Sequence, residues 1–85
     1  GAGYAGLQQV VDLAPDIIKL DMSLTRKIDT DPVRYALGGA MVDFARHIGS
    51  VVLAEGIETE GERAALCKLG VSLGQGYLLG RPMPI

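Results

Sequence analysis

Lysine and carboxylate side chains stand at the ends of two short apolar runs in this chain. Lys19 and Asp21 close the run that begins at Ile17, and Glu55 closes the run that begins at Val51. A lysine in this position can hold a phosphate or stabilise a developing negative charge. An ion pair between Lys19 and Asp21 is the structural alternative, because opposite charges on one face of a buried strand offset each other's desolvation.

Two further polar residues are candidates of the same kind. Glu58 follows the second run, and Gln75 lies between two glycines, where its amide either reaches a ligand or forms a turn. Glu58 and Glu60 are alternatively acids placed near the start of a helix, where the helix dipole favours them. His47 has no second histidine to form a metal pair, and Cys67 is a small apolar residue, so both are interpreted as structural.

Three helices and three short strands are expected to position these side chains. In chain order they are a helix at 7–13, a strand at 17–21, a helix at 33–48, a strand at 51–55, a helix at 59–69 and a strand at 71–79. Each helix is long enough to cross between parallel neighbours. The order therefore predicts an α/β fold with parallel strands.

The segments between these elements carry their own expectations. Residues 22–30 are expected to form a loop, and residues 80–84 a terminal turn rich in glycine and proline. The long helix is expected to bury an apolar stripe at three- and four-residue spacing. That stripe consists of Leu37, Met41 and Phe44.

A nucleotide-binding fingerprint is one alternative that the glycines raise. Gly1, Gly3 and Gly6 fit the pattern G-x-G-x-x-G, and Asp21 lies near the distance of a ribose-binding acid. The fingerprint requires a strand directly before its first glycine, which this sequence does not show. The helix that follows is also short for a dinucleotide crossover, so a glycine-rich loop is the preferred interpretation.

Composition and length bound the function classes. With Lys+Arg at 8 against Asp+Glu at 10, no basic surplus is available to hold duplex nucleic acid. The single cysteine excludes a disulfide-stapled scaffold and favours the cytoplasm. No apolar run approaches the ~20 residues of a membrane span, so no direct membrane contact is expected.

A TIM barrel takes ~250 residues for eight βα units, so this chain length holds about three such units. Their strand edges are expected to be uncovered, and self-association is predicted.

Four motifs together resemble the C-terminal part of the EAL domain family. They are Gly1-Ala2-Gly3-Tyr4, Pro15-Asp16-Ile17-Ile18-Lys19-Leu20-Asp21, Ala54-Glu55-Gly56-Ile57-Glu58-Thr59 and Gly74-Gln75-Gly76-Tyr77-Leu78-Leu79-Gly80-Arg81-Pro82. The resemblance covers essentially the whole chain and implies the last three βα units of a TIM-type barrel. Residues 1–85 are therefore expected to be a partial EAL domain whose N-terminal part is absent. The family hydrolyses cyclic di-GMP, a bacterial second messenger, to pGpG with Mg²⁺ or Mn²⁺.

The resemblance also implies roles for the candidate site residues. Lys19 resembles the lysine near the attacking water and the scissile phosphate. Glu55 resembles the catalytic glutamate of this strand, and Glu58 its supporting acid. Gln75 resembles the glutamine that helps to arrange water or metal ligands, and Asp21 is given a supporting role.

Several family features are missing from the sequence. The Glu-Ala-Leu motif, the Asn and Glu ligands of intervening strands and the Asp-Asp pair do not occur in these residues, while residues 1–6 resemble the end of the metal-associated loop. No complete metal site is therefore expected, and the isolated chain is expected to be inactive. The parent domain is expected to be a cyclic di-GMP phosphodiesterase, which other domains could anchor to a membrane. The alternatives are an inactive cyclic di-GMP receptor, a protein-interaction scaffold or a self-associated structural piece.

Overall fold

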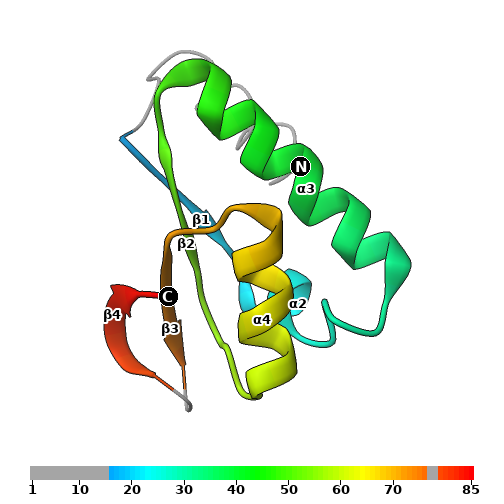
Figure 1. Ribbon diagram of the computed structural model, residues 1–85. Helices are drawn as coiled ribbons and strands as arrows, with labels where there is room; N and C mark the ends of the chain where they lie inside the picture. The colour runs from blue at the N-terminus through cyan, green and yellow to red at the C-terminus, as the bar shows by residue number, and fades with distance from the viewer. Residues whose placement is uncertain (1–15, 77–78) are drawn as a thin grey trace, which may run out of the picture.

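The computed structural model describes residues 16–76 and 79–85, which form one sheet covered by helices (Figure 1). The strands are β1 (Ile17–Leu20), β2 (Val51–Ala54), β3 (Leu73–Gly76) and β4 (Gly80–Pro84), and they lie side by side in this order. Strands β1, β2 and β3 run parallel, and β4 runs antiparallel to β3. The helices are α2 (Met22–Thr25), α3 (Pro32–Ile48) and α4 (Glu60–Leu69). The predicted α/β fold with parallel strands is confirmed.

Both long helices begin and end at the residues that their local sequence indicates. The Asp31 side chain accepts hydrogen bonds from two backbone N–H groups of the first turn of α3, and the capping box of Thr59 and Glu62 opens α4. Gly49 and Gly70 end the two helices with φ of 74° and 101°, the left-handed conformation that glycine adopts at low cost. These local signals fix the length of each crossover.

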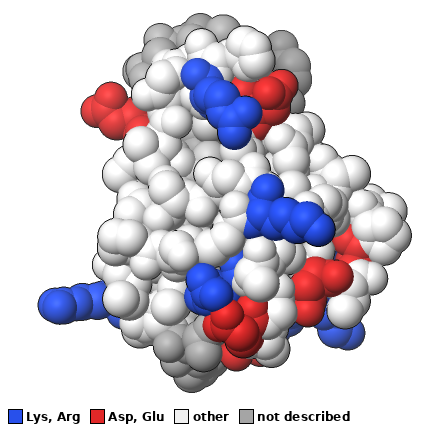
Figure 2. Space-filling model, in the orientation of Figure 1, with Lys and Arg blue, Asp and Glu red and all other residues white. Residues whose placement is uncertain are grey.

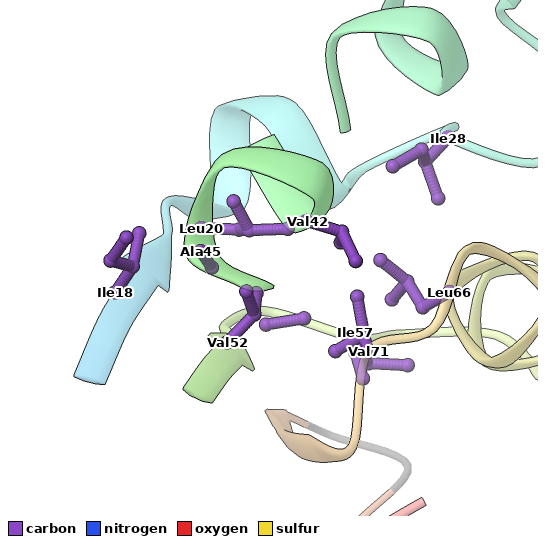
Figure 3. Close-up of a cluster of buried hydrophobic side chains, with 10 residues drawn as sticks. Ile18, Leu20, Ile28, Val42, Ala45, Val52, Ile57, Leu66 and Val71 are labelled. Atoms are coloured by element: carbon purple, nitrogen blue, oxygen red, sulfur yellow. The ribbon is translucent and has the colours of Figure 1, made fainter. Parts of the chain in front are cut away.

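One hydrophobic core lies between the sheet and the two long helices (Figure 3). Its buried members are Ile18, Leu20, Ile28, Val42, Ala45, Val52, Ala54, Ile57, Leu66 and Val71. Burying one such Val, Leu or Ile side chain contributes roughly 1.5–3 kcal/mol to folding. The described helices cover this face of the sheet, so alternation along β1 turns Lys19 away from the core, where it is exposed.

The apolar stripe predicted for the core-facing side of α3 is wrong for two of its three residues. Leu37 and Phe44 are 52% and 37% exposed, while Met41 packs at the edge of the core. The buried residues of α3 are Gly38, Val42 and Ala45. A Cβ on Gly38 would lie 2.9 Å from Cδ1 of Ile28, so a residue without a side chain is what allows the close approach. Small residues, not the bulkiest ones, therefore set the buried face.

Two segments predicted to be irregular contain regular structure. The predicted loop at 22–30 begins with the short helix α2, and the predicted turn at 80–84 is the strand β4. The predicted strand at 71–79 is correspondingly shorter, because β3 ends at Gly76 and the chain turns back to pair with it. Prolines are tolerated in β4 because it is the last strand of the described sheet. β4 also covers the edge of β3 that was expected to be open. The predicted helix at 7–13 lies outside the described residues.

The surface of the described residues carries both signs of charge. On the face drawn in Figure 2, acidic side chains lie near several of the basic ones, and the basic side chains do not gather into one patch. That distribution differs from the basic surface that holds a nucleic acid duplex. Within residues 16–76 and 79–85, no helix is both long and apolar enough to cross a membrane.

Candidate functional site

A pocket of about 530 Å³ opens where the three parallel strands end. This size falls within the ~300–1,000 Å³ of small-molecule sites. Its described lining residues are Asp21, Met22, Arg26, Glu55, Gly56, Glu58, Gln75, Gly76 and Gly80. Parallel strands end at the same edge of a sheet, so the residues that follow them converge there.

Strand register places three of the candidate side chains in one row. Ala54 of β2 pairs with Leu20 of β1 and with Gly74 of β3. The residues one position further along each strand are Asp21, Glu55 and Gln75. All three line the pocket, as does Glu58 from the loop that follows β2. The structure thus brings together four of the five residues proposed from the sequence.

Lys19 is the fifth candidate, and it does not line the pocket. It pairs with Leu53 of β2, two positions before the row of Asp21 and Glu55. It lies on the same face of β1 as Asp21, two residues or about 6.6 Å back along the strand. Within the described part of the chain, no ion pair joins Lys19 to Asp21.

Asp21 is instead bound to the helix that follows it. Its carboxylate accepts hydrogen bonds from the hydroxyl of Ser23 at 2.7 Å and from the backbone N–H of Ser23 at 3.0 Å. The hydroxyl, and after it the N–H, hold the pKa of the Asp21 carboxyl below its usual value. Asp21 is thereby the N-cap of α2. Its geometry is that of a structural acid at the edge of the pocket.

Arg26 is a lining residue that the sequence did not indicate. Its Nη2 donates to Oε1 of Glu58, and the same nitrogen lies 3.3 Å from the sulfur of Met22. Arg26 and Glu58 are 32 residues apart in sequence, so no local pattern could have predicted the pair. The predicted supporting acid, Glu58, is therefore already bound to a cation at the rim of the pocket.

Glu62 joins the two loops that carry this ion pair. Its side chain is buried, and Oε2 accepts the N–H of Lys27 at 2.9 Å. Oε1 accepts the N–H groups of Glu58 at 2.8 Å and Thr59 at 3.2 Å. Burial by itself raises the pKa of Glu62, but the three N–H donors and the nearby charge of Arg26 together outweigh it, and the pKa lies below its usual value. The capping box accounts for the contact with Thr59 but not for the contact with Lys27.

Two glycines allow the backbone of the pocket to pack closely. A Cβ on Gly56, where φ is 74°, would clash with Cβ of Met22, and one on Gly76 would clash with the backbone N and O of Ile57. The N–H of Ile57 donates to the carbonyl of Gln75 at 3.0 Å. The loop after β2 is therefore held directly against β3, which fixes the row of polar side chains.

The described residues do not form a site for a divalent metal ion by themselves. Mg²⁺ takes an octahedral set of oxygen ligands. Asp21 is committed to Ser23 and Glu58 to Arg26, which leaves Glu55 and Gln75 as the pocket's other side-chain oxygens. Across the described ranges, no group of three or more His, Cys, Asp or Glu residues is placed to hold a metal ion.

Known proteins resemble this chain over nearly its whole length. The EAL domain family profile matches residues 1–82. The chain is 38% identical over 84 residues to the cyclic di-GMP phosphodiesterase RocR of Pseudomonas aeruginosa, covering 99% of this chain and 21% of RocR. It is 40% identical over 84 residues to the cyclic di-GMP phosphodiesterase PdeR of Escherichia coli, covering 99% of this chain and 13% of PdeR.

Solved structures share the arrangement of strands and helices. BlrP1 of Klebsiella pneumoniae, in a complex with manganese and cyclic di-GMP, aligns with a TM-score of 0.84 and 39% identity over 96% of this chain and 21% of that one. A second BlrP1 structure, with FMN, cyclic di-GMP and no metal ions, aligns with a TM-score of 0.75 and 37% identity over 82% of this chain and 19% of that one. The EAL enzyme Bd1971 in its cGMP-bound form aligns with a TM-score of 0.81 and 35% identity, over 93% of this chain and 21% of that one.

The chain therefore corresponds to a small part of a larger barrel, spanning 21% or less of the curated relatives described above. The family and fold predicted from the four motifs are confirmed by both kinds of comparison. This chain belongs to the EAL domain family.

Proposed function

We propose that this chain supplies part of a cyclic di-GMP phosphodiesterase site, namely the part that contains Glu55. The observation that carries the proposal is the row of Asp21, Glu55 and Gln75 at the pocket. Its support from relatives is that RocR and PdeR are cyclic di-GMP phosphodiesterases and that BlrP1 holds cyclic di-GMP. We place the function in the cytoplasm, because a single cysteine suits a reducing compartment.

The proposed reaction is hydrolysis of one phosphodiester of cyclic di-GMP. Water adds to phosphorus, the bond to the 3′-oxygen breaks, and this oxygen takes a proton from solvent to become the 3′-hydroxyl. The linear product pGpG carries the new 5′-phosphate monoester. Glu55 accepts a proton of the attacking water, and Gln75 orients that water. Lys19, on the same face of the sheet, offsets the negative charge that develops on the phosphoryl group. Glu58 supports the site through its ion pair with Arg26.

Binding without hydrolysis is the second candidate function, and a specific observation favours it for the isolated chain. Glu58 is engaged by Arg26, and the described residues lack a cluster of acids that could hold a metal ion. BlrP1 has been solved with cyclic di-GMP in the absence of metal ions, so nucleotide binding by a relative does not require the metal. We therefore propose that the chain on its own binds cyclic di-GMP weakly and does not hydrolyse it.

The proposal is tested by measuring binding and turnover separately in the purified chain. Calorimetric titration with cyclic di-GMP is expected to show saturable binding without metal. Glu55→Gln is expected to change the binding affinity, and the control Glu60→Gln, which lies outside the pocket, is expected to leave it unchanged. Chromatography after incubation with Mn²⁺ is expected to show no pGpG. Turnover that persists after contaminating enzymes are removed, and that Glu55→Gln abolishes, would show that the chain is itself an enzyme. Absence of any binding would overturn the proposed nucleotide site.

A further inference from the structure

We infer that Arg26 is the group of this pocket that contacts a phosphate of the bound nucleotide, an inference that rests on the proposed function. The described lining contains three carboxylates, on Asp21, Glu55 and Glu58, and Arg26 is the only cation among them. Each phosphodiester group of a cyclic dinucleotide carries one negative charge. Such a ligand is repelled by the carboxylates unless a positive group meets it.

The guanidinium of Arg26 keeps hydrogen-bonding capacity for a ligand. Arginine presents five N–H donors in a planar fork that matches a phosphate group in a bidentate manner. The described contacts of its side chain, with Glu58 and with the sulfur of Met22, both use Nη2. Among the described residues, Nε and Nη1 have no hydrogen-bond partner, and the side chain is 47% exposed. Nη2 is thus engaged by the protein, while the N–H groups of Nε and Nη1 can each donate to an anion.

The backbone on both sides of Arg26 is also fixed before a ligand arrives. The N–H of Arg26 donates to the carbonyl of Met22 at 2.9 Å, which closes the turn of α2. The next residue, Lys27, has φ of 62° and donates its N–H to the buried carboxylate of Glu62 at 2.9 Å. A group held in this way loses little freedom on binding, which favours affinity.

Two other cations near the pocket are less suited to this role. Lys19 does not line the pocket. Arg34 is held by the Asp31 carboxylate and donates its Nε to the carbonyl of Ser23 at 2.9 Å. It lines a neighbouring hollow beside α2, which Met22 and Arg26 also line, but it does not line the pocket. Arg34 is therefore a matched control, because it is an ion-paired arginine close to Arg26 that lies outside the pocket.

The consequence is measurable as a change in affinity. Charge-assisted hydrogen bonds to a phosphate are strong enough that Arg26→Gln is expected to weaken cyclic di-GMP binding about tenfold or more. Arg26→Lys keeps the charge but loses the fixed planar arrangement of N–H donors, so its affinity is expected to fall between those of the wild type and Arg26→Gln. Arg34→Gln is expected to stay within about twofold of the wild type.

The experiment is a pair of NMR titrations of the isotope-labelled chain, one with cyclic di-GMP without metal and one with inorganic phosphate. The amide spectrum of each variant reports whether it is folded, and if Arg26→Gln does not fold, Arg26→Lys decides. Equal cyclic di-GMP affinities for the wild type and the Arg26 variants would overturn the inference while leaving the proposed function intact.

A wild type that does not bind cyclic di-GMP would instead overturn the proposed function. The phosphate titration then decides the role of Arg26 alone. A saturable shift of the Arg26 Nε–H that persists in Arg34→Gln supports an anion site at this side chain. Absence of that shift would overturn the inference.

Discussion

Replacing Glu62 by glutamine tests how the two loops at the pocket are joined. In the wild type, one carboxylate oxygen accepts the N–H of Lys27 and the other accepts those of Glu58 and Thr59. Glutamine has the same shape but offers one oxygen and one NH₂ group. Whichever way the amide is turned, its NH₂ group faces at least one backbone N–H donor, which loses its acceptor.

The expected loss of stability follows from these contacts. Leaving one buried donor unsatisfied costs about 1–3 kcal/mol, and the remaining bonds weaken because their acceptor is no longer charged. Glu62→Gln is therefore expected to lower the free energy of unfolding at neutral pH by roughly 2–3 kcal/mol. For a small domain with a total of ~5–15 kcal/mol, this is a large fraction.

Urea unfolding followed by circular dichroism measures the loss, and hydrogen exchange locates it. Glu62→Gln is expected to lower the denaturation midpoint and to speed exchange of the Lys27, Glu58 and Thr59 amides. Glu60→Gln is the control, because Glu60 is an exposed acid of the same helical turn that pairs with Arg63. Equal midpoints for the two variants would refute the role given to Glu62.

The same variant has a signature in pH. The pKa of Glu62 in the folded chain lies below its ordinary value of 4.5, so on acidification the unfolded chain takes up the proton first. The stabilisation by this carboxylate is therefore present above about pH 4.5 and is lost as the pH falls through the folded pKa. The difference in stability between wild type and Glu62→Gln should shrink below that pH. A difference that stays constant from pH 7 to pH 3 would contradict this assignment.

Two further predictions concern packing and assembly. Gly76→Ala is expected to lower the melting temperature markedly, because its Cβ would clash with the backbone of Ile57. The control Gly39→Ala lies within a helix, with its Cβ 3.4 Å from Leu69, and is expected to be neutral or stabilising. Equal melting temperatures for the two variants would contradict the close packing at Gly76. The purified chain is expected to self-associate through β1, the terminal strand of the described sheet, and through the exposed Leu37 and Phe44, and light scattering that shows a compact, stable monomer would contradict this.

The parts of the fold that could be predicted from the sequence are those set by neighbouring residues. Asp31 before a proline, the glycines at 49 and 70, and the pairing of Thr59 with Glu62 each act within one helical turn, and they set the observed ends of α3 and α4. The sequence also marked Asp21, Glu55 and Gln75 as candidates, and the parallel strands bring these three together at one edge, whereas the candidate Lys19 does not line the pocket.

The features that were missed depend on contacts between distant segments. The Arg26–Glu58 pair and the Lys27–Glu62 hydrogen bond span 32 and 35 residues, so they emerge only when the loops are folded together. The prediction for the buried face of α3 was wrong because that face includes Gly38, whose lack of a side chain allows close packing against Ile28. The spacing of hydrophobic residues does not reveal such a position. Strand β4 was missed because its proline content is typical of a turn, whereas an edge strand tolerates it.

Mapping of the cyclic di-GMP contact surface on the labelled chain tests the central claim most directly. Two cavities of similar size can be compared in this measurement. One is the pocket of about 530 Å³ at the strand ends, and the other is a cavity of about 560 Å³ beside Tyr35 and Lys68. The proposed nucleotide site predicts that intermolecular NOEs from cyclic di-GMP reach Gly56, Gln75 and Gly76 and leave the second cavity unaffected. NOEs confined to Tyr35 and Lys68 would contradict the claim that the polar row at the ends of β1, β2 and β3 is the nucleotide site.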